Sequence, residues 1–158
     1  MRNTILIPTD FSGTSLLLLK QVALTSSSVS DVIFLYSKSM PDSITDLLFY
    51  SPSRVLNNSI PKEFRDGCSI MKNRYSEKIG SIKYEIFHGN TRNSFRNLVN
   101  AFRVDKVILA KDYSLQLSAN EFDPTSLILH SGVPIHEVDL NLGTYVREQD
   151  LIAQLLTN

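Results

Sequence analysis

The stretch ILIPTDFSGTS, Ile5–Ser15, joins an apolar run to a polar corner. The run is rich in isoleucine and ends at Pro8, which is typical of a buried strand that stops there. From Ser12 onward the apolar spacing becomes helical, and one face carries Leu16, Leu19, Val22 and Ala23. A buried strand that passes directly into an amphipathic helix indicates the start of an α/β fold.

The same alternation continues along the chain. Apolar runs predict four further strands, at residues 31–36, 81–87, 105–110 and 133–140. Helical spacing predicts helices after Pro61, with Phe64, Cys68, Met71 and Tyr75 on one face, over residues 91–102, and over 123–130. The segment 38–62 holds three prolines and predicts one short helix, at ITDLLFY (44–50). Five strands with helical crossovers predict one doubly wound parallel sheet with helices on both faces.

Composition limits the function classes. The chain has 158 residues, of which 42% are hydrophobic, so we expect a single core. Sixteen Lys and Arg balance sixteen Asp and Glu, which argues against nucleic acid or an anionic membrane as a partner. The first ten residues lack the apolar core of a signal peptide, and no later run has the length of a membrane span. We therefore expect a cytoplasmic protein, which the single cysteine, Cys68, also favours.

Four segments together resemble the universal stress protein family: ILIPTDFSGTS (5–15), VIFLYS (32–37), HGNTRNSFRNLV (88–99) and DKVILA (105–110). The first is the most specific, because a strand that ends Pro, Thr, Asp, Phe, Ser before a helix is the family's usual opening. The resemblance implies an adenine nucleotide alpha hydrolase-like fold with strand order 3-2-1-4-5. It also implies a homodimer in which fifth strands meet edge to edge.

Some members of that family bind ATP. In those members the adenosine lies at the ends of the first, second and fourth strands, which the resemblance places here at Pro8, Thr9, Asp10, Ser37 and Ala110. A glycine-rich segment after the fourth strand holds the phosphates, because a Cβ would keep the backbone amides away from them. This chain has no glycine between Gly89 and Gly132, and the matching segment carries Asp112, Glu121 and Asp123. Lys111 supplies one opposing charge, so the sequence predicts no bound ATP.

Other polar residues have simpler interpretations. Asp10 stands at a strand end where α/β sheets place functional groups, but Asp10 or Ser12 also fits as the cap of the following helix. The three histidines, His88, His130 and His136, lie on separate segments without metal-ligand spacing. Cys68 falls on an apolar stripe and is expected in the core. A solvated helix face explains Arg92, Arg96 and Arg103. No catalytic grouping is present, so we expect no enzyme, no catalytic residues and no metal.

Two functional hypotheses follow. The first is a non-enzymatic stress-response module, similar to the universal stress proteins, that regulates through dimerisation and protein contacts without a cofactor. The alternative is an adenine-nucleotide-binding protein for AMP or ATP with Mg²⁺, a modified phosphate site and at most weak hydrolysis. Residues 1–142 form the domain, and residues 143–158 add a helix with Leu151, Ile152, Leu155 and Leu156 on one side. A third hypothesis is that this helix mediates assembly, either by capping the edge of the fifth strand or by exchange between subunits.

Overall fold

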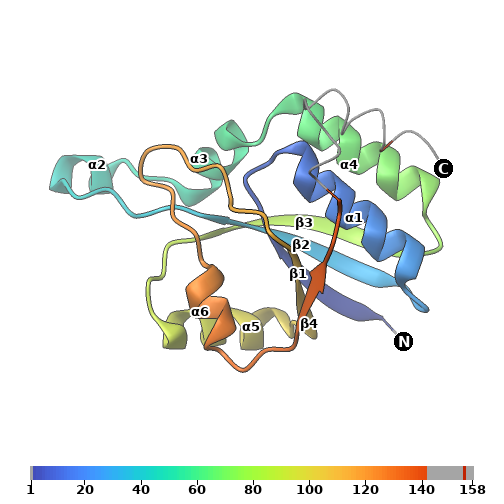
Figure 1. Ribbon diagram of the computed structural model, residues 1–158. Coiled ribbons are helices and arrows are strands. Elements are labelled where there is room, and N and C mark those ends of the chain that lie inside the picture. The colour runs from blue at the N-terminus through green and yellow to red at the C-terminus, as the bar shows by residue number, and fades with distance from the viewer. Residues whose placement is uncertain (1, 142–154, 156–158) are drawn as a thin grey trace.

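The computed structural model describes residues 2–141 and Leu155. Strands and helices alternate in the described residues (Figure 1). The strands are β1 (Asn3–Pro8), β2 (Ser30–Ser37), β3 (Ile79–Phe87), β4 (Lys106–Ala110) and β5 (Ile135–Val138). The helices are α1 (Gly13–Thr25), α2 (Ile44–Leu48), α3 (Pro52–Ser59), α4 (Lys62–Arg74), α5 (Arg92–Phe102) and α6 (Thr125–Leu129).

The five strands form one parallel sheet in the order β3-β2-β1-β4-β5. This confirms both the predicted sheet and the strand order that the family resemblance implied. The strand order reverses at β1, whose Ile5 pairs with Val32 of β2 on one side and with Lys106 of β4 on the other. The carboxyl ends of β1 and β4 therefore border the crevice in which such sheets bind ligands.

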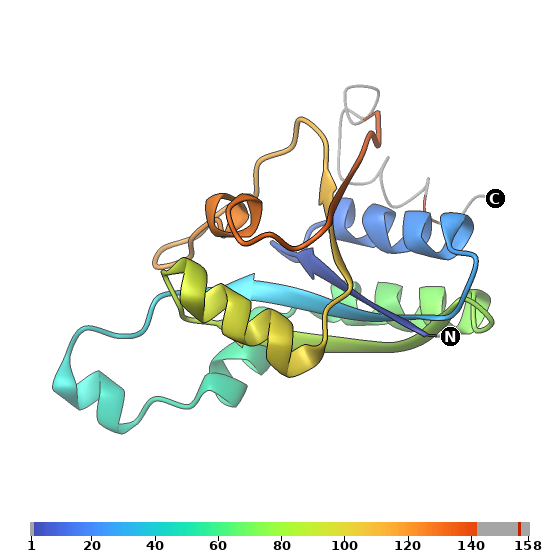
Figure 2. The same cartoon turned by 90° about the horizontal axis from the view of Figure 1, so that it is seen from below.

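Helices cover both faces of the sheet, as predicted (Figures 1 and 2). On one face α1 and α4 pack over a core that includes Ile5, Leu19 and Phe34. On the other face α5 and α6 pack over Leu6, Phe95 and Ile128. Alternate residues of β1 thus enter opposite cores, and burial on both sides explains why its sequence is continuously apolar.

The segment between β2 and α4 differs from the prediction, because it holds two helices rather than one. The missed helix is α3, which has Pro52 in its first turn and the Ser51 hydroxyl as a cap that accepts from Arg54 N at 3.4 Å. Proline is tolerated at that position because the first turn leaves its amide unbonded in any case. The segment's other helix, α2, projects away from the sheet in both views (Figures 1 and 2).

Two other expectations need comment. The helix predicted over 123–130 shortens to α6, a single turn that begins after Pro124. The division of the chain at residue 142 and the terminal helix lie outside the described residues, apart from Leu155. Within residues 2–141, no helix has the length and hydropathy needed to cross a membrane.

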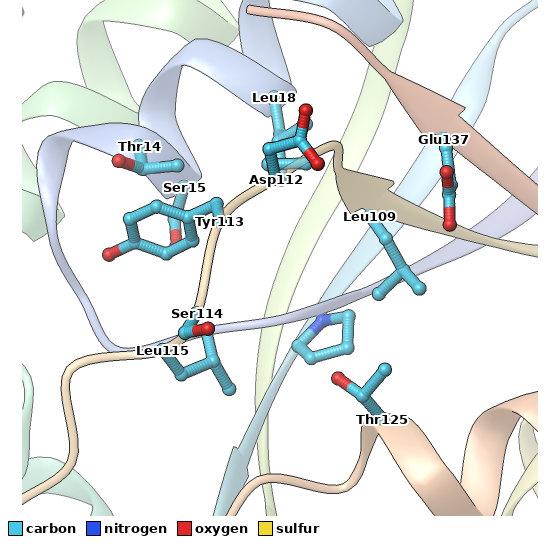
Figure 3. A pocket seen from close by; sticks show the side chains of 12 residues that line it. Thr14, Ser15, Leu18, Leu109, Asp112, Tyr113, Ser114, Leu115, Thr125 and Glu137 are labelled. Atoms are coloured by element: carbon cyan, nitrogen blue, oxygen red, sulfur yellow. The ribbon is translucent and has the colours of Figure 1, made fainter. Parts of the chain in front are cut away.

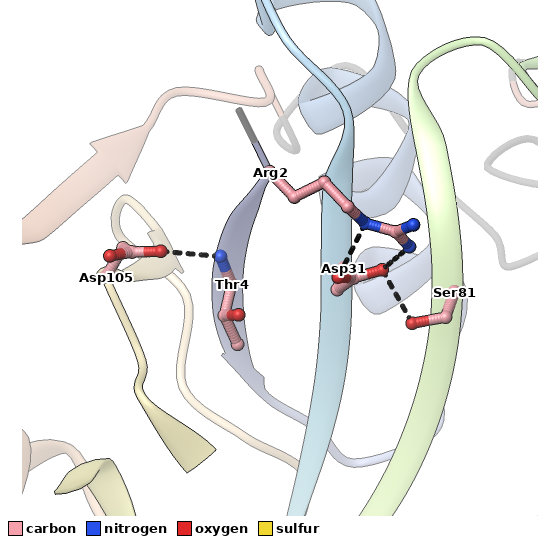
Figure 4. A network of polar contacts seen from close by, with 5 residues as sticks. All are labelled: Arg2, Thr4, Asp31, Ser81 and Asp105. Carbon is pink, nitrogen blue, oxygen red and sulfur yellow. Dashed lines mark hydrogen bonds and ion pairs between the residues drawn. The ribbon is translucent and has the colours of Figure 1, made fainter.

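Polar contacts secure the amino ends of the strands (Figure 4). The Arg2 guanidinium makes a two-pronged contact with the Asp31 carboxylate, with Nε at 3.0 Å from Oδ2. The Ser81 hydroxyl donates to the same carboxylate at 2.8 Å, and Asp105 accepts from Thr4 N at 2.7 Å. Together these contacts join β1, β2 and β3 to the residue that precedes β4.

The hydrogen bond from Arg2 lowers the pKa of Asp31 below its ordinary value of 3.8. Because the folded pKa is below the unfolded one, the stabilisation is present above pH 3.8 and is lost as the pH falls through the folded pKa. We expect Asp31→Asn to unfold at lower urea than the wild type near neutral pH, and the difference to vanish in acid. Urea titrations over that range measure it. The exposed Asp42→Asn is the control, and an Asp31→Asn difference that persists unchanged in acid would contradict the expectation.

Candidate functional site at the carboxyl ends of the strands

The corner after β1 is built by local hydrogen bonds. The buried Thr9 hydroxyl accepts from Phe11 N and lies 2.8 Å from the Ser15 hydroxyl. Phe11 takes a left-handed backbone with a φ of 59°, an uncommon conformation for a bulky residue. This turn lets the chain leave a buried strand and enter α1 within four residues. Thr9 therefore acts here as a structural residue of the turn.

The predicted helix cap is only partly correct. Ser12 is the residue at the N-cap position of α1, but its side chain accepts no hydrogen bond from the helix amides. The Ser12 hydroxyl instead lies 3.2 Å from the Tyr113 hydroxyl. Asp10 accepts from Ser12 N at 3.1 Å, which closes a local turn and leaves the other carboxylate oxygen for more distant donors.

That second oxygen of Asp10 binds the loop that follows β4. Oδ2 accepts from the Tyr113 hydroxyl and, at 2.9 Å, from Gln116 N. Asp10 thus receives three donors, two of them more than a hundred residues away in the sequence. Its carboxylate is an anchor for the loop, and this use was not predicted from the sequence.

The loop over residues 111–124 continues across the end of β2. Lys38 and Glu121 form an antiparallel bridge, and Ser39 N donates to Asn120 O at 2.7 Å. The Tyr36 hydroxyl donates to the Glu121 carboxylate, which also accepts from Ser118 N at 2.7 Å. The carboxylate that the sequence analysis counted against a bound phosphate therefore holds the loop against the sheet.

Two residues of this loop adopt left-handed backbone without being glycine. Asp112 has a φ of 55° and Asn120 a φ of 67°. Aspartate and asparagine are the non-glycine residues that tolerate this conformation best. The loop therefore makes its turns while keeping a side chain at each, so the backbone there is less open to a ligand than a glycine-rich one.

A cavity of about 230 Å³ remains between the loop, α1 and the ends of β1 and β4. Figure 3 shows Tyr113 of the loop next to Thr14 and Ser15 of α1, with Leu109 and Glu137 on the strand side. Pro8 and Ala110, two of the predicted site residues, line it, as do the carboxylates of Asp112 and Glu137. Hydroxyl groups and carboxylates thus dominate its polar lining.

The other predicted site residues are not gathered around this cavity. Ser37 is buried, and its hydroxyl has no hydrogen-bond partner among the described residues, while its carbonyl accepts from Phe122 N at 3.2 Å. Lys111 is exposed, and its backbone amide bonds to Val138 O of β5 at 2.8 Å. The structure thus brings Pro8 and Ala110 together at the cavity, while Asp10 and Ser37 contact the loop and Thr9 belongs to the turn before α1.

The two tyrosines that bind carboxylates have altered acidity. Burial, reinforced by the hydrogen bond to Asp10, raises the pKa of Tyr113 to about 12. Burial and Glu121 likewise raise the pKa of Tyr36 to about 12. Both phenols are therefore protonated hydrogen-bond donors at neutral pH.

The remaining polar candidates have structural surroundings. His88 bridges the Tyr50 hydroxyl, at 2.9 Å, and Lys38 O, at 2.7 Å. Cys68 is buried, which raises its pKa to about 11, so the prediction of a core cysteine is confirmed. The side chains of Arg92, Arg96 and Arg103 are exposed, as predicted. Among residues 2–141, no three His, Cys, Asp or Glu side chains form a group that would hold a metal ion.

Comparison with known proteins identifies the fold. No family model matches the sequence, and no curated protein matches it. Solved structures do match: a universal stress protein in complex with cAMP has 15% identity and a TM-score of 0.51, covering 86% of this chain and 96% of that chain. The chain has the fold of the universal stress proteins.

Two further structures support the universal stress protein fold. Universal stress protein UspA from Lactobacillus plantarum has 15% identity and a TM-score of 0.50, and the match covers 86% of this chain and 97% of that one. Hypothetical protein MJ0577 has 21% identity and a TM-score of 0.53, with 87% and 95% covered. These matches confirm the fold that the resemblance implied, and at these identities they concern the fold alone.

Proposed function

We propose that this chain is a non-enzymatic, universal stress protein-like regulatory module that acts through dimerisation and protein contacts and does not bind ATP. The observation that carries the proposal is the anchoring of Tyr113 and Gln116 on Asp10. A nucleotide at this corner would have to displace donors that already satisfy the carboxylate. The loss of those hydrogen bonds would make the binding free energy of the nucleotide less favourable.

Two surfaces support a role in protein contacts. Three apolar side chains on and next to α2, those of Ile44, Leu48 and Phe49, have exposed fractions of 75% to 79%. No residue of α2 is buried. Large apolar side chains clustered in this way commonly mark interaction surfaces. The sheet also ends in β5, whose only strand neighbour in residues 2–141 is β4. Its free edge is suited to the edge-to-edge dimer that we propose.

The alternative is adenine-nucleotide binding, and one observation favours it: a cavity lies at the strand ends, between Pro8 and Ala110. A structure of the same fold is in complex with cAMP. However, about 230 Å³ is below the roughly 300–1,000 Å³ of ordinary ligand pockets. Asp112 and Glu137 also line the cavity and would repel a phosphate.

Thermal unfolding of the purified protein with ATP, ADP, AMP and cyclic AMP, with and without Mg²⁺, separates the two functions. We expect no shift in the melting temperature and no nucleotide released on denaturation, as measured by mass spectrometry. A ligand at a hundred times its Kd would stabilise the fold by about 2.7 kcal/mol, a shift of several degrees. Such a shift with ATP and Mg²⁺ would contradict our proposal.

The variant Tyr113→Ala tests the cause of that result. If the Tyr113 side chain blocks the corner, nucleotides should stabilise this variant while leaving the wild type unchanged. Tyr113→Phe is the matched control, because it keeps the ring in place and removes only the hydroxyl. An absence of binding in all three proteins would show that features other than Tyr113, such as the carboxylates, exclude the nucleotide. Sedimentation velocity on the same samples measures the proposed dimer.

A further inference from the structure

An apolar groove lies between the start of α1 and the length of α4, two helices that run side by side on one face of the sheet (Figures 1 and 2). Its volume is about 510 Å³, within the range of clefts that take a ligand or a peptide side chain. The lining is mainly apolar and includes Phe11, Leu16, Phe64, Ile70 and Met71. This groove is separate from the cavity beside Tyr113.

Close contact between the two helices shapes the groove. A Cβ added at Gly67 of α4 would lie 2.8 Å from Leu16 Cδ1 of α1, so a larger residue there would require the Leu16 side chain to shift. Gly13 of α1 lines the groove as well. Backbone therefore forms part of the wall, which leaves space for side chains from elsewhere.

One such side chain comes from the far end of the sequence. Leu155 lines the groove, is only 4% exposed and belongs to the same core cluster as Leu16 and Phe64. On both sides of it the sequence places Leu151, Ile152 and Leu156, at the spacing of one helical face. Leu155 itself therefore lies at this groove, and it is the described residue of a segment whose sequence has an apolar helical face.

Chain length agrees with this occupant. Leu140, close to the end of the continuous described chain, is buried in the same cluster as Leu155. Thirteen residues lie between Asn141 and Leu155, and the fourteen steps along the chain can span up to roughly 46 Å, so reach is not limiting.

We propose that residues 143–158 of the same chain dock as an amphipathic helix in the groove between α1 and α4, with Leu151, Ile152, Leu155 and Leu156 against the apolar lining. This is helix-in-groove recognition within one chain. The tether gives the segment a high effective concentration at the groove, so a free peptide of the same sequence has to compete with it. The proposal does not depend on whether the chain binds nucleotide.

Fluorescence of the full chain tests the docking directly, because the sequence contains no tryptophan. We expect Ile152→Trp to give blue-shifted emission that is protected from a soluble quencher. In a double variant, Ile70→Asp is combined with Ile152→Trp. Ile70 lines the groove and is 47% exposed, and its replacement should shift the emission to that of a solvated tryptophan. Adding Leu129→Asp, at a 54% exposed position of α6, is the matched control and should leave it unchanged.

Binding in trans is the second measurement. A labelled synthetic peptide of residues 143–158 should bind the full-length Leu155→Asp protein at least ten times more tightly than the wild type, whose groove is occupied. A peptide that itself carries Leu155→Asp should not bind. Equal binding to both proteins, or none to a folded Leu155→Asp chain, would overturn the proposal. Emission typical of a solvated tryptophan in Ile152→Trp would also overturn the proposal. Emission that changes when the protein is diluted would overturn it as well, because such a change indicates docking between two copies of the chain.

Discussion

Asp10→Ala is expected to lower the free energy of unfolding by about 2–4 kcal/mol, because hydrogen bonds to a carboxylate contribute about 1.5–3 kcal/mol each and water replaces part of the loss. The substitution removes the acceptor for Ser12 N, the Tyr113 hydroxyl and Gln116 N. It should also free the start of the loop over 111–124. Urea unfolding measures the first effect, and the rate of tryptic cleavage after the exposed Lys111 measures the second.

The control for this experiment is Asp112→Asn. Asp112 is an exposed carboxylate in the same loop, and asparagine keeps its left-handed backbone favourable. We expect its stability to stay within about 0.5 kcal/mol of the wild type. If Asp10→Ala unfolds at the wild-type urea concentration and its loop resists trypsin equally, then Asp10 does not anchor the loop. The corner would in that case be available to a ligand.

Phe11→Ala is expected to cost about 3–5 kcal/mol, the usual loss for a buried phenylalanine. The Phe11 ring is 8% exposed and packs against Tyr36, at a centroid distance of 5.1 Å, and Phe64, at 5.3 Å. Phe11→Gly removes the same ring but suits the φ of 59° at this position. It should therefore be about 1 kcal/mol more stable than Phe11→Ala. Thermal or urea unfolding of both variants measures the difference.

Alanine and glycine variants of Leu19, which is fully buried in the middle of α1, are the matched control. Their order of stability is expected to be the reverse of that at Phe11. There the glycine variant should be less stable than the alanine variant by about 1 kcal/mol, because glycine is unfavourable inside a helix. If Phe11→Gly were also the less stable of its pair, residue 11 would not hold a left-handed backbone in solution. The turn from β1 into α1 would then need another explanation.

Both predictions concern the corner where the resemblance to universal stress proteins implied a nucleotide site. In this chain the loop over 111–124 occupies part of that corner. Tyr113 reaches Asp10 and Ser12, and Glu121 reaches Tyr36. Glu121, one of the carboxylates that argue against a phosphate in the sequence, therefore has two effects, since it also fixes the loop at the strand ends.

The main signal that sequence reasoning missed was Tyr113. An aromatic residue three positions after a strand end has no distinctive spacing, and its partner Asp10 lies 103 residues earlier. Gln116 was equally hidden, because its contribution is a backbone amide. The helix α3 was missed for a local reason, since the prolines of its segment suggested breaks, although Pro52 starts a helix.

The sequence by itself determined the fold class, the apolar faces of α4 and α5 and the burial of β1, because hydrophobic period is a local property that each element carries in its own residues. It also indicated that the segment after β4 lacks the glycines of a phosphate loop. It did not show that α1 is buried on nearly all sides, Leu17, Leu18 and Lys20 included. Only the tertiary structure decided what Asp10 binds, why Phe11 is left-handed and that Leu155 reaches the groove between α1 and α4. Those features depend on contacts between residues far apart in the chain, whose pairing is set by the packing of the whole sheet and its helices.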